Sequence, residues 1–101
     1  MSKSESHKKA QSKAAGKNGY TEYELKNGQK LDAMSANKKR ATEIERNGNF
    51  SDAISRLKSS GASQKVLQVP QKDMKRAEQA MEEAGVKGTI KNMSGTKRKS
   101  V

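Results

Sequence analysis

The sequence predicts an α+β (α/β) protein built around one mixed sheet, and three observations lead to that prediction. Short stretches in the middle of the chain alternate apolar and polar residues, as half-buried strands do. Two longer stretches repeat apolar residues every three to four positions, as amphipathic helices do. Glycine or proline separates most of these stretches. The expected order is αβββαβαβ, in which three strands form an antiparallel meander and a parallel strand-helix-strand unit follows.

Charge divides the chain into one core and two basic ends. Residues 1–18 carry five lysines against one glutamate, a net charge of +4, and residues 87–101 carry five basic residues and no acid, a net +5. Residues 19–86 therefore hold only +2 of the total of +11. We expect a basic N-terminal segment at 1–18 that is a weak helix or disordered. A single α/β domain at 19–93 and a basic, disordered tail at 94–101 complete the predicted organisation.

Residues before the middle of the chain predict one helix and three strands. Residues 4–15 can form a short helix, although alanines are its only apolar residues. Residues 19–26 alternate in the manner of a half-buried strand. The turn at Asn27–Gly28 suits a type I′ hairpin and leads into a strand at 30–34. A third strand is expected at 40–46, after a polar loop.

The second half predicts two helices and two strands. A helix is expected to start near residues 49–51 and to end before Gly61, which is a natural residue after a helix. Residues 65–69 form the most apolar short run and predict a buried strand. Residues 71–84 carry the strongest helical pattern, with a stripe of methionine and alanine. Residues 86–92 predict the last strand.

The residue types exclude several kinds of function. The absence of cysteine removes disulfides, thiolate catalysis and cysteine-based zinc sites. No apolar run reaches the length of a membrane span or a secretory signal, so we expect a soluble chain without a membrane partner. P-loop, zinc, helix-turn-helix and RNP motifs are also missing. The only histidine, His7, lies in a lysine-rich terminus, where we expect it to be solvated rather than to act as a base or ligand.

Three carboxylates on the expected second and third strands are candidates for a site. Glu43 and Glu45 are two residues apart and therefore share one face of a strand. Asp32 can lie opposite either of them if the strands pair across the intervening loop. Such an oxygen-rich group suits a hard divalent cation. A solvated, charged face of a hairpin explains the same residues.

The basic ends indicate a polyanionic partner. Nucleic acid is the commonest one, because each phosphate that a protein neutralises releases counterions. Basic ends that only keep a small protein in solution are the alternative. The residues expected to contact nucleic acid, DNA or RNA, are basic residues of the strand region and of the tail: Lys38, Lys39, Arg40, Arg46, Lys97, Arg98 and Lys99.

Two stretches, GQKLDAMS and ATEIERNG, and the order of elements around them resemble the PD-(D/E)xK nuclease superfamily. The likeness covers residues 20–93 and is closest to the small restriction-endonuclease-like domains that end polymorphic and contact-dependent toxins. It implies that Asp32 and Glu43 hold Mg²⁺ or Mn²⁺. It also implies a cytoplasmic site of action, delivery within a larger secreted protein, and a cognate immunity protein as inhibitor.

The chain departs from the family pattern at Glu45, where the family has lysine. Lys30, two residues before Asp32 and on the same face, can supply the missing cation. Either Glu45 is an added metal ligand or base, or the site is degenerate and the fold only binds. Three functions therefore remain open: a metal-dependent nuclease that cleaves DNA or RNA, a non-catalytic basic nucleic-acid-binding protein, and a small interaction protein.

Overall fold

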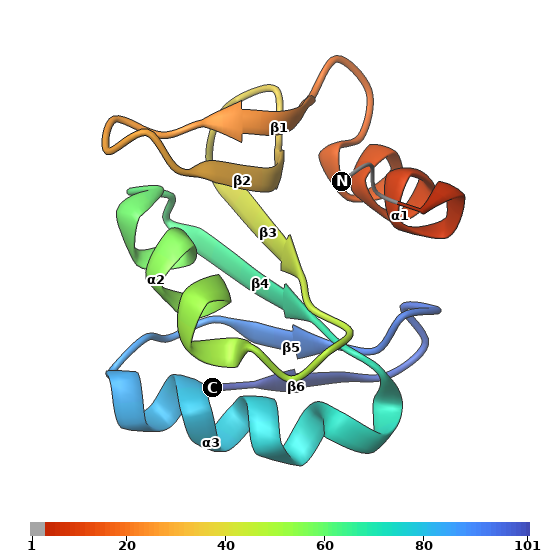
Figure 1. Cartoon of the computed structure of the whole chain (residues 1–101), viewed down its shortest axis with the longest axis vertical. Coiled ribbons are helices and arrows are strands. Elements are labelled where there is room, and N and C mark those ends of the chain that lie inside the picture. The colour runs from red at the N-terminus through yellow and green to blue at the C-terminus, as the bar shows by residue number, and fades with distance from the viewer. Residues whose placement is uncertain (1–3) are drawn as a thin grey trace.

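The computed structural model describes residues 4–101 of the chain. The strands are β1 (Tyr20–Glu24), β2 (Lys30–Met34), β3 (Arg40–Ile44), β4 (Gln64–Gln68), β5 (Thr89–Lys91) and β6 (Arg98–Ser100). The helices are α1 (Glu5–Ala15), α2 (Phe50–Ser59) and α3 (Met74–Ala84), with a single 3₁₀ turn, η1 (Gln71–Asp73), before α3. Among these residues the strands form one six-stranded sheet in the order β1-β2-β3-β4-β5-β6 (Figure 1).

The sheet is mixed, which confirms the predicted fold class. β1, β2 and β3 form the expected antiparallel meander. β3 pairs in parallel with β4, and β4 pairs in parallel with β5. α2 and α3 make the two crossovers between these parallel strands. The predicted parallel strand-helix-strand unit is therefore present, and a second one precedes it.

The chain differs from the prediction at its C-terminal end. The sequence predicts a disordered tail at 94–101, but β6 pairs antiparallel with β5, and Lys91 lies opposite Arg98. The buried Asn92 holds the turn between them, because its Oδ1 accepts a hydrogen bond of 3.1 Å from the backbone N–H of Lys97. Main-chain pairing of an edge strand needs no apolar side chains, so the polar pattern of this segment gives no sign of it.

The N-terminal segment and the first hairpin turn also have defined structures. α1 is a helix rather than a disordered segment, and the Ser4 side chain caps it by accepting the N–H of His7 at 3.2 Å. At the β1–β2 turn, Gly28 has a positive φ of 88° and the residue before it does not. The N–H of Leu25 donates to the carbonyl of Gln29 at 2.7 Å. The turn is thus a three-residue loop with glycine in the left-handed region, and the type I′ prediction is wrong.

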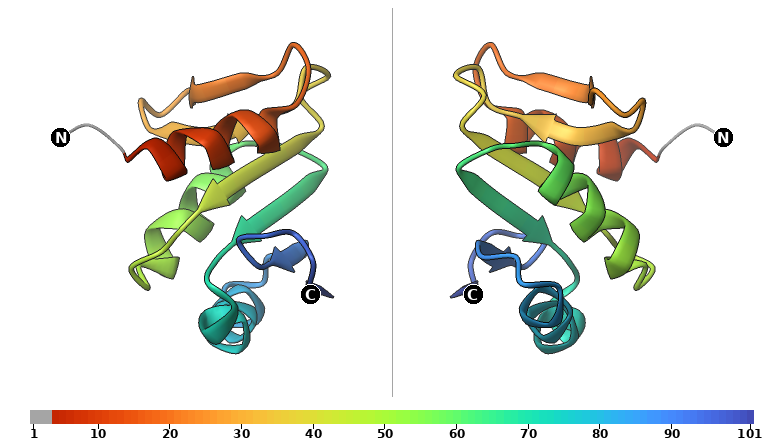
Figure 2. Two further views of the ribbon diagram at one scale, coloured as in Figure 1. Left: turned by 90° about the vertical axis from the view of Figure 1, so that its right-hand side faces the viewer. Right: turned by 90° about the vertical axis from the view of Figure 1, so that its left-hand side faces the viewer.

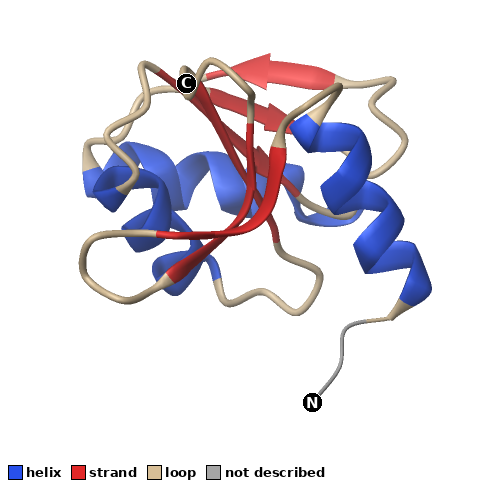
Figure 3. Cartoon of the chain, turned by 90° about the horizontal axis from the view of Figure 1, so that it is seen from above, coloured by secondary structure: helices blue, strands red, loops and turns tan. Residues whose placement is uncertain are grey.

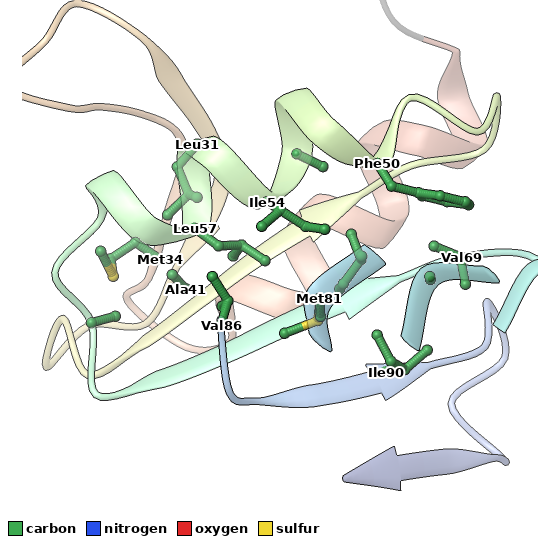
Figure 4. Packing of buried hydrophobic residues seen from close by; sticks show 14 of the residues in the cluster. Leu31, Met34, Ala41, Phe50, Ile54, Leu57, Val69, Met81, Val86 and Ile90 are labelled. Atoms are coloured by element: carbon green, nitrogen blue, oxygen red, sulfur yellow. The ribbon is translucent and has the colours of Figure 1, made fainter. Parts of the chain in front are cut away.

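The hydrophobic core lies between one face of the sheet and helices α2 and α3 (Figure 4). Leu57, Leu67, Val69, Met81 and Ile90 are fully buried in it. The apolar run at 65–69 and the methionine-bearing helix therefore meet as the sequence predicts. No helix within residues 4–101 has both the length and the apolar character needed to cross a membrane.

Helix α1 lies on the opposite face of the sheet from α2 and α3 (Figure 3). It packs on β1, β2 and β3. Figure 2 shows that it does not extend over β5 and β6. The two flanks of α1 therefore border different surfaces. One faces the junction of β2 with β3, and the other faces the half of the sheet that α1 leaves open.

Candidate active site

Asp32 and Glu43 lie together where the pairing of β2 with β3 stops. The paired residues end at Ala33 and Thr42. At the next position, the backbone N–H of Asp32 donates to Glu43 Oε2 at 2.7 Å, and the N–H of Ile44 donates to Asp32 Oδ2 at 2.8 Å. Each carboxylate thus accepts a backbone hydrogen bond from the neighbouring strand. These two bonds fix the positions of both carboxylates.

Pairing is also interrupted on the other side of β2, because the β1–β2 register skips Glu22 and Asp32. Glu22 has a φ of 51°, in the left-handed region that residues other than glycine seldom adopt. The Glu22 carboxylate accepts a hydrogen bond from the buried side chain of Gln11 in α1. Sparsely populated backbone conformations of this kind cluster at functional sites. The sheet is therefore irregular on both sides of Asp32.

Helix α1 supplies donors to Asp32. His7 Nε2 lies 3.2 Å from Asp32 Oδ1, and Gln11 Nε2 donates to the same oxygen at 3.2 Å. The two residues are four apart in the helix, so they share the face that packs on β2. The side chain of His7 is only 16% exposed. The expectation of a solvated His7 is therefore wrong, because docking of α1 places the ring against a carboxylate.

Helix α2 supplies the partner of Glu43 from the other face of the sheet. Arg56 Nη1 lies 2.9 Å from Glu43 Oε1, and the two side chains are 31% and 3% exposed. Burial, together with the negative charge of Asp32, raises the pKa of Glu43 to about 7. Hydrogen bonds from the backbone of Asp32 and from Arg56 act in the opposite direction without cancelling these effects. The pair therefore holds a carboxyl group that titrates near neutral pH.

The oxygens of the two carboxylates divide into an inner and an outer pair. The inner oxygens, Asp32 Oδ2 and Glu43 Oε2, accept backbone N–H groups. The outer oxygens, Asp32 Oδ1 and Glu43 Oε1, meet the side chains of His7, Gln11 and Arg56. Side chains can move aside more easily than backbone, so the donors on the outer oxygens are the easier ones to displace. Mg²⁺ takes one or two carboxylates and keeps several waters, so this pair fits such an ion in kind and number.

The third predicted carboxylate is not part of the same cluster. Glu45 and Lys30 line the pocket in front of Asp32 and Glu43, whose volume is about 430 Å³. The Glu45 carboxylate accepts the backbone N–H of Asn47 at 2.8 Å instead of turning to the pair. Within residues 4–101, no three or more histidine, aspartate or glutamate side chains form a group that could hold a metal ion. The structure thus brings two of the three predicted carboxylates together.

The predicted nucleic-acid contacts are spread over several surfaces. Lys38 Nζ lies 5.9 Å from the ring centres of both Tyr20 and Tyr23. Lys99 turns toward α3, where its Nζ is 3.8 Å from Glu78 Oε2. The other predicted residues are exposed: Lys39, Arg40, Arg46, Lys97 and Arg98. Arg40 and Arg98 line one pocket, and none of the predicted contact residues lines the pocket in front of Asp32 and Glu43.

Four of the residues around the carboxylate pair are absent from the prediction: His7, Gln11, Glu22 and Arg56. A weak signal exists for Arg56, which lies between the apolar residues Ile54 and Leu57 at the border of the buried stripe. For the two α1 residues, the spacing of four with the buried Ala15 is the only hint. Comparison of the chain with protein-family models, with curated proteins and with solved structures gives no match. The fold and the pocket therefore define the class: a small α+β protein with a buried acidic pair at an open pocket.

Proposed function

We propose that the protein is a nuclease that cleaves phosphodiester bonds of DNA or RNA at the pocket in front of Asp32 and Glu43, with Mg²⁺ or Mn²⁺. The observation that carries this proposal is the pair itself, two buried carboxylates that accept backbone N–H groups across adjacent strands. The chain has a net charge of +11 and attracts polyanions. Carboxylates at the bottom of a pocket repel phosphate unless a cation lies between them. A pair fixed in this way therefore suits metal-assisted phosphate chemistry better than binding alone.

The residues around the pocket have separable roles in this proposal. Asp32 and Glu43 would hold the ion. A divalent cation supplies Lewis-acid polarisation of the phosphate when it is bound. Arg56 and Lys30 line the pocket and neutralise charge on the phosphate oxygens. Glu45 lines the same pocket and accepts the proton of the attacking water.

The direct test is incubation of the protein with plasmid DNA and with tRNA, in Mg²⁺, in Mn²⁺ and in EDTA. We expect cleavage of at least one substrate with a metal and none with EDTA. Asp32→Ala and Glu43→Ala should each lower the rate by about 100-fold or more while binding persists. Glu83→Ala, an exposed carboxylate on α3, is the matched control and should keep full activity. Equal cleavage in EDTA, or by the Asp32→Ala variant, would contradict the proposal.

Glu45 offers a sharper variant, because the resembled family has lysine there. If Glu45 takes the proton of the attacking water, Glu45→Lys should lower the cleavage rate by about 100-fold or more. If the site is degenerate, the same change should create activity in an inactive protein. Both rates are measured with the better of the two substrates and with the wild-type chain alongside. An unchanged rate would remove Glu45 from the chemistry.

The alternative function is non-catalytic binding of nucleic acid. It is favoured by one observation, that all four carboxylate oxygens already have donors within the described part of the chain. The same assay separates the two functions, because a binding protein retards the substrates in a gel and leaves them uncut with every metal.

The toxin role belongs to the nuclease proposal. It places the action in the cytoplasm after delivery within a larger secreted protein and requires a cognate inhibitor. Growth arrest of cells that express the wild-type chain, with normal growth for Asp32→Ala, is the expected result. Normal growth with both would contradict the toxin role.

A further inference from the structure

A second polar surface lies on the flank of α1 that faces away from Asp32. It is a groove of about 490 Å³ between the end of α1 and the open half of the sheet. Five cations line it, but the Nζ of Lys65 donates to the carbonyl of Ala62 at 2.6 Å. We call this surface the basic groove and define it by the other four cations, Lys13, Arg40, Lys91 and Arg98. None of the described residues that line it is acidic or aromatic.

The cations of the basic groove have few partners among residues 4–101. No ion pair or hydrogen bond there engages the amino group of Lys13 or Lys91, or the guanidinium of Arg98, and Arg40 Nε donates only to the neutral side chain of Gln64 at 3.2 Å. Burial, and then the charges of Arg98, Lys13 and Arg40, lower the pKa of Lys91. The fold therefore concentrates positive charge without a described counter-charge, and an anion would relieve the repulsion.

The cations of the basic groove come from one helix and three strands, so their backbones are spread along the groove. Lys91 and Arg98 are register partners on adjacent strands and therefore lie side by side. Arg40 is a register partner of Gln64, whereas Lys91 is a register partner of Gln68. Arg40 and Lys91 are thus two strands and four residues apart, which puts their Cα atoms on the order of 15 Å apart in a regular sheet. The repeated phosphates of a nucleic-acid backbone can contact several of these cations at once.

We propose that the basic groove binds the phosphate backbone of the nucleic acid that is cut at the Asp32–Glu43 pocket. This inference rests on the proposed function, which it deepens by naming the binding surface. Lys13 and His7 border the two sites from opposite flanks of α1 and are about 9 Å apart along the helix axis. That distance corresponds to two or three nucleotide steps at about 3.4 Å each. Without aromatic side chains to stack on bases, the groove contacts the backbone and is indifferent to sequence.

The test measures binding of the protein to a fluorescein-labelled duplex DNA and to a labelled RNA of scrambled sequence at several salt concentrations. Fluorescence anisotropy reports the binding, and EDTA is present throughout. The double variant Lys91→Gln, Arg98→Gln should bind on the order of tenfold more weakly than wild type. Its slope of log K against log salt should be shallower by about 2, because two phosphate contacts are lost. The control is Lys72→Gln, Lys75→Gln, which removes two exposed lysines beside and on α3, on the opposite face. It should bind nearly as wild type does.

The outcomes distinguish failure of the basic groove as a binding surface from failure of the proposed nuclease activity. If the groove variant binds like wild type, or if the control loses as much affinity, the basic groove is overturned even when wild type cleaves its substrate. If wild type binds through the groove and cleaves nothing with any metal, the proposed nuclease function fails and the groove stands. Binding of wild type to phosphatidylglycerol vesicles, with no binding to DNA or RNA, also overturns the groove as a nucleic-acid site. Thermal unfolding of both double variants shows that each is folded.

Discussion

The two flanks of α1 border charged sites of opposite sign that are built in opposite ways. On one flank, Asp32 and Glu43 are buried and receive backbone and side-chain donors. On the other flank, the cations of the basic groove lie toward an open surface without a described counter-charge. Only the first site depends on breaks in strand pairing, at the β2–β3 junction and beside it. The difference separates a site whose geometry is fixed from one that supplies charge alone.

This difference teaches how a small chain can hold two kinds of charge on one sheet. Buried carboxylates need fixed donors, because an unpartnered charge in a dry place costs several kcal/mol. Exposed cations need no such support, since water screens them. The acidic pair should therefore dominate the dependence of stability on pH, and the groove should dominate the dependence of binding on salt. Single substitutions at either site test whether stability depends on the acidic pair and binding depends on the groove.

The largest effect on stability is expected for Glu43→Gln. The pKa of Glu43 is raised from 4.5 to about 7 in the folded protein, so the folded state keeps a proton that the unfolded chain loses. The stabilising contribution of Glu43 is thus complete below pH 4.5 and is lost as pH rises through about 7. Between pH 4.5 and about 7, the free energy of unfolding of wild type should fall by up to about 3 kcal/mol. That of the glutamine variant should not fall in this way. Urea unfolding at both ends of the interval, with EDTA present, measures the difference.

The matched control for this prediction is Glu83→Gln, which removes an exposed carboxylate of α3. Its free energy of unfolding should follow that of wild type at each pH. Parallel pH curves for wild type and Glu43→Gln would show that Glu43 does not titrate near neutral pH. The raised pKa of Glu43 would then be contradicted, although the hydrogen bonds that hold the carboxylate pair would be unaffected.

Much of the fold follows from the sequence because local patterns decide it. β2 has the predicted bounds, 30–34, since a glycine turn precedes it and a polar loop follows it. β3 is shorter than predicted and ends at Ile44, because the chain turns away toward α2 at Asn47–Gly48. β6 escapes prediction, since only its backbone takes part in the sheet. Element types are thus encoded locally, whereas edge pairing is not.

The candidate site is predictable only in its strand residues. Asp32 and Glu43 can be paired from the expected hairpin, and the structure places them together. His7 and Arg56 come from helices on opposite faces, and their positions depend on how those helices dock. α1 has almost no apolar residues apart from alanine, so its docking direction leaves little trace in the sequence. Tertiary packing therefore determines the electrostatics of the pair.

A smaller effect is expected for Arg56→Gln, which removes the guanidinium from Glu43. Above about pH 7 the variant should be less stable than wild type by about 1–2 kcal/mol, because a buried carboxylate then lacks its cation. This expected loss of stability is smaller than is usual when a buried ion pair is broken, because the Arg56 side chain is 31% exposed. At low pH the loss should shrink, because Glu43 is then neutral. Lys58→Gln, an exposed cation on the same helix, is the control and should change little at either pH. A loss that is equal at both pH values would contradict the pairing.

The smallest effect is expected in the basic groove, for Lys91→Gln. Burial and three neighbouring cations disfavour the charged form of Lys91 and lower its pKa, so the charge is a burden on the folded state. The variant should therefore be slightly more stable than wild type near neutral pH, by less than about 1 kcal/mol. The part of the gain that comes from repulsion should fade in about 1 M salt, where the screening length is only about 3 Å.

The control for this prediction is Lys75→Gln, on the opposite face, which should show no such salt-dependent gain in stability. A gain in stability combined with weaker nucleic-acid binding is what a surface kept for function predicts. A loss of more than about 1 kcal/mol would instead make Lys91 a structural residue, and the contrast between the two flanks of α1 would disappear.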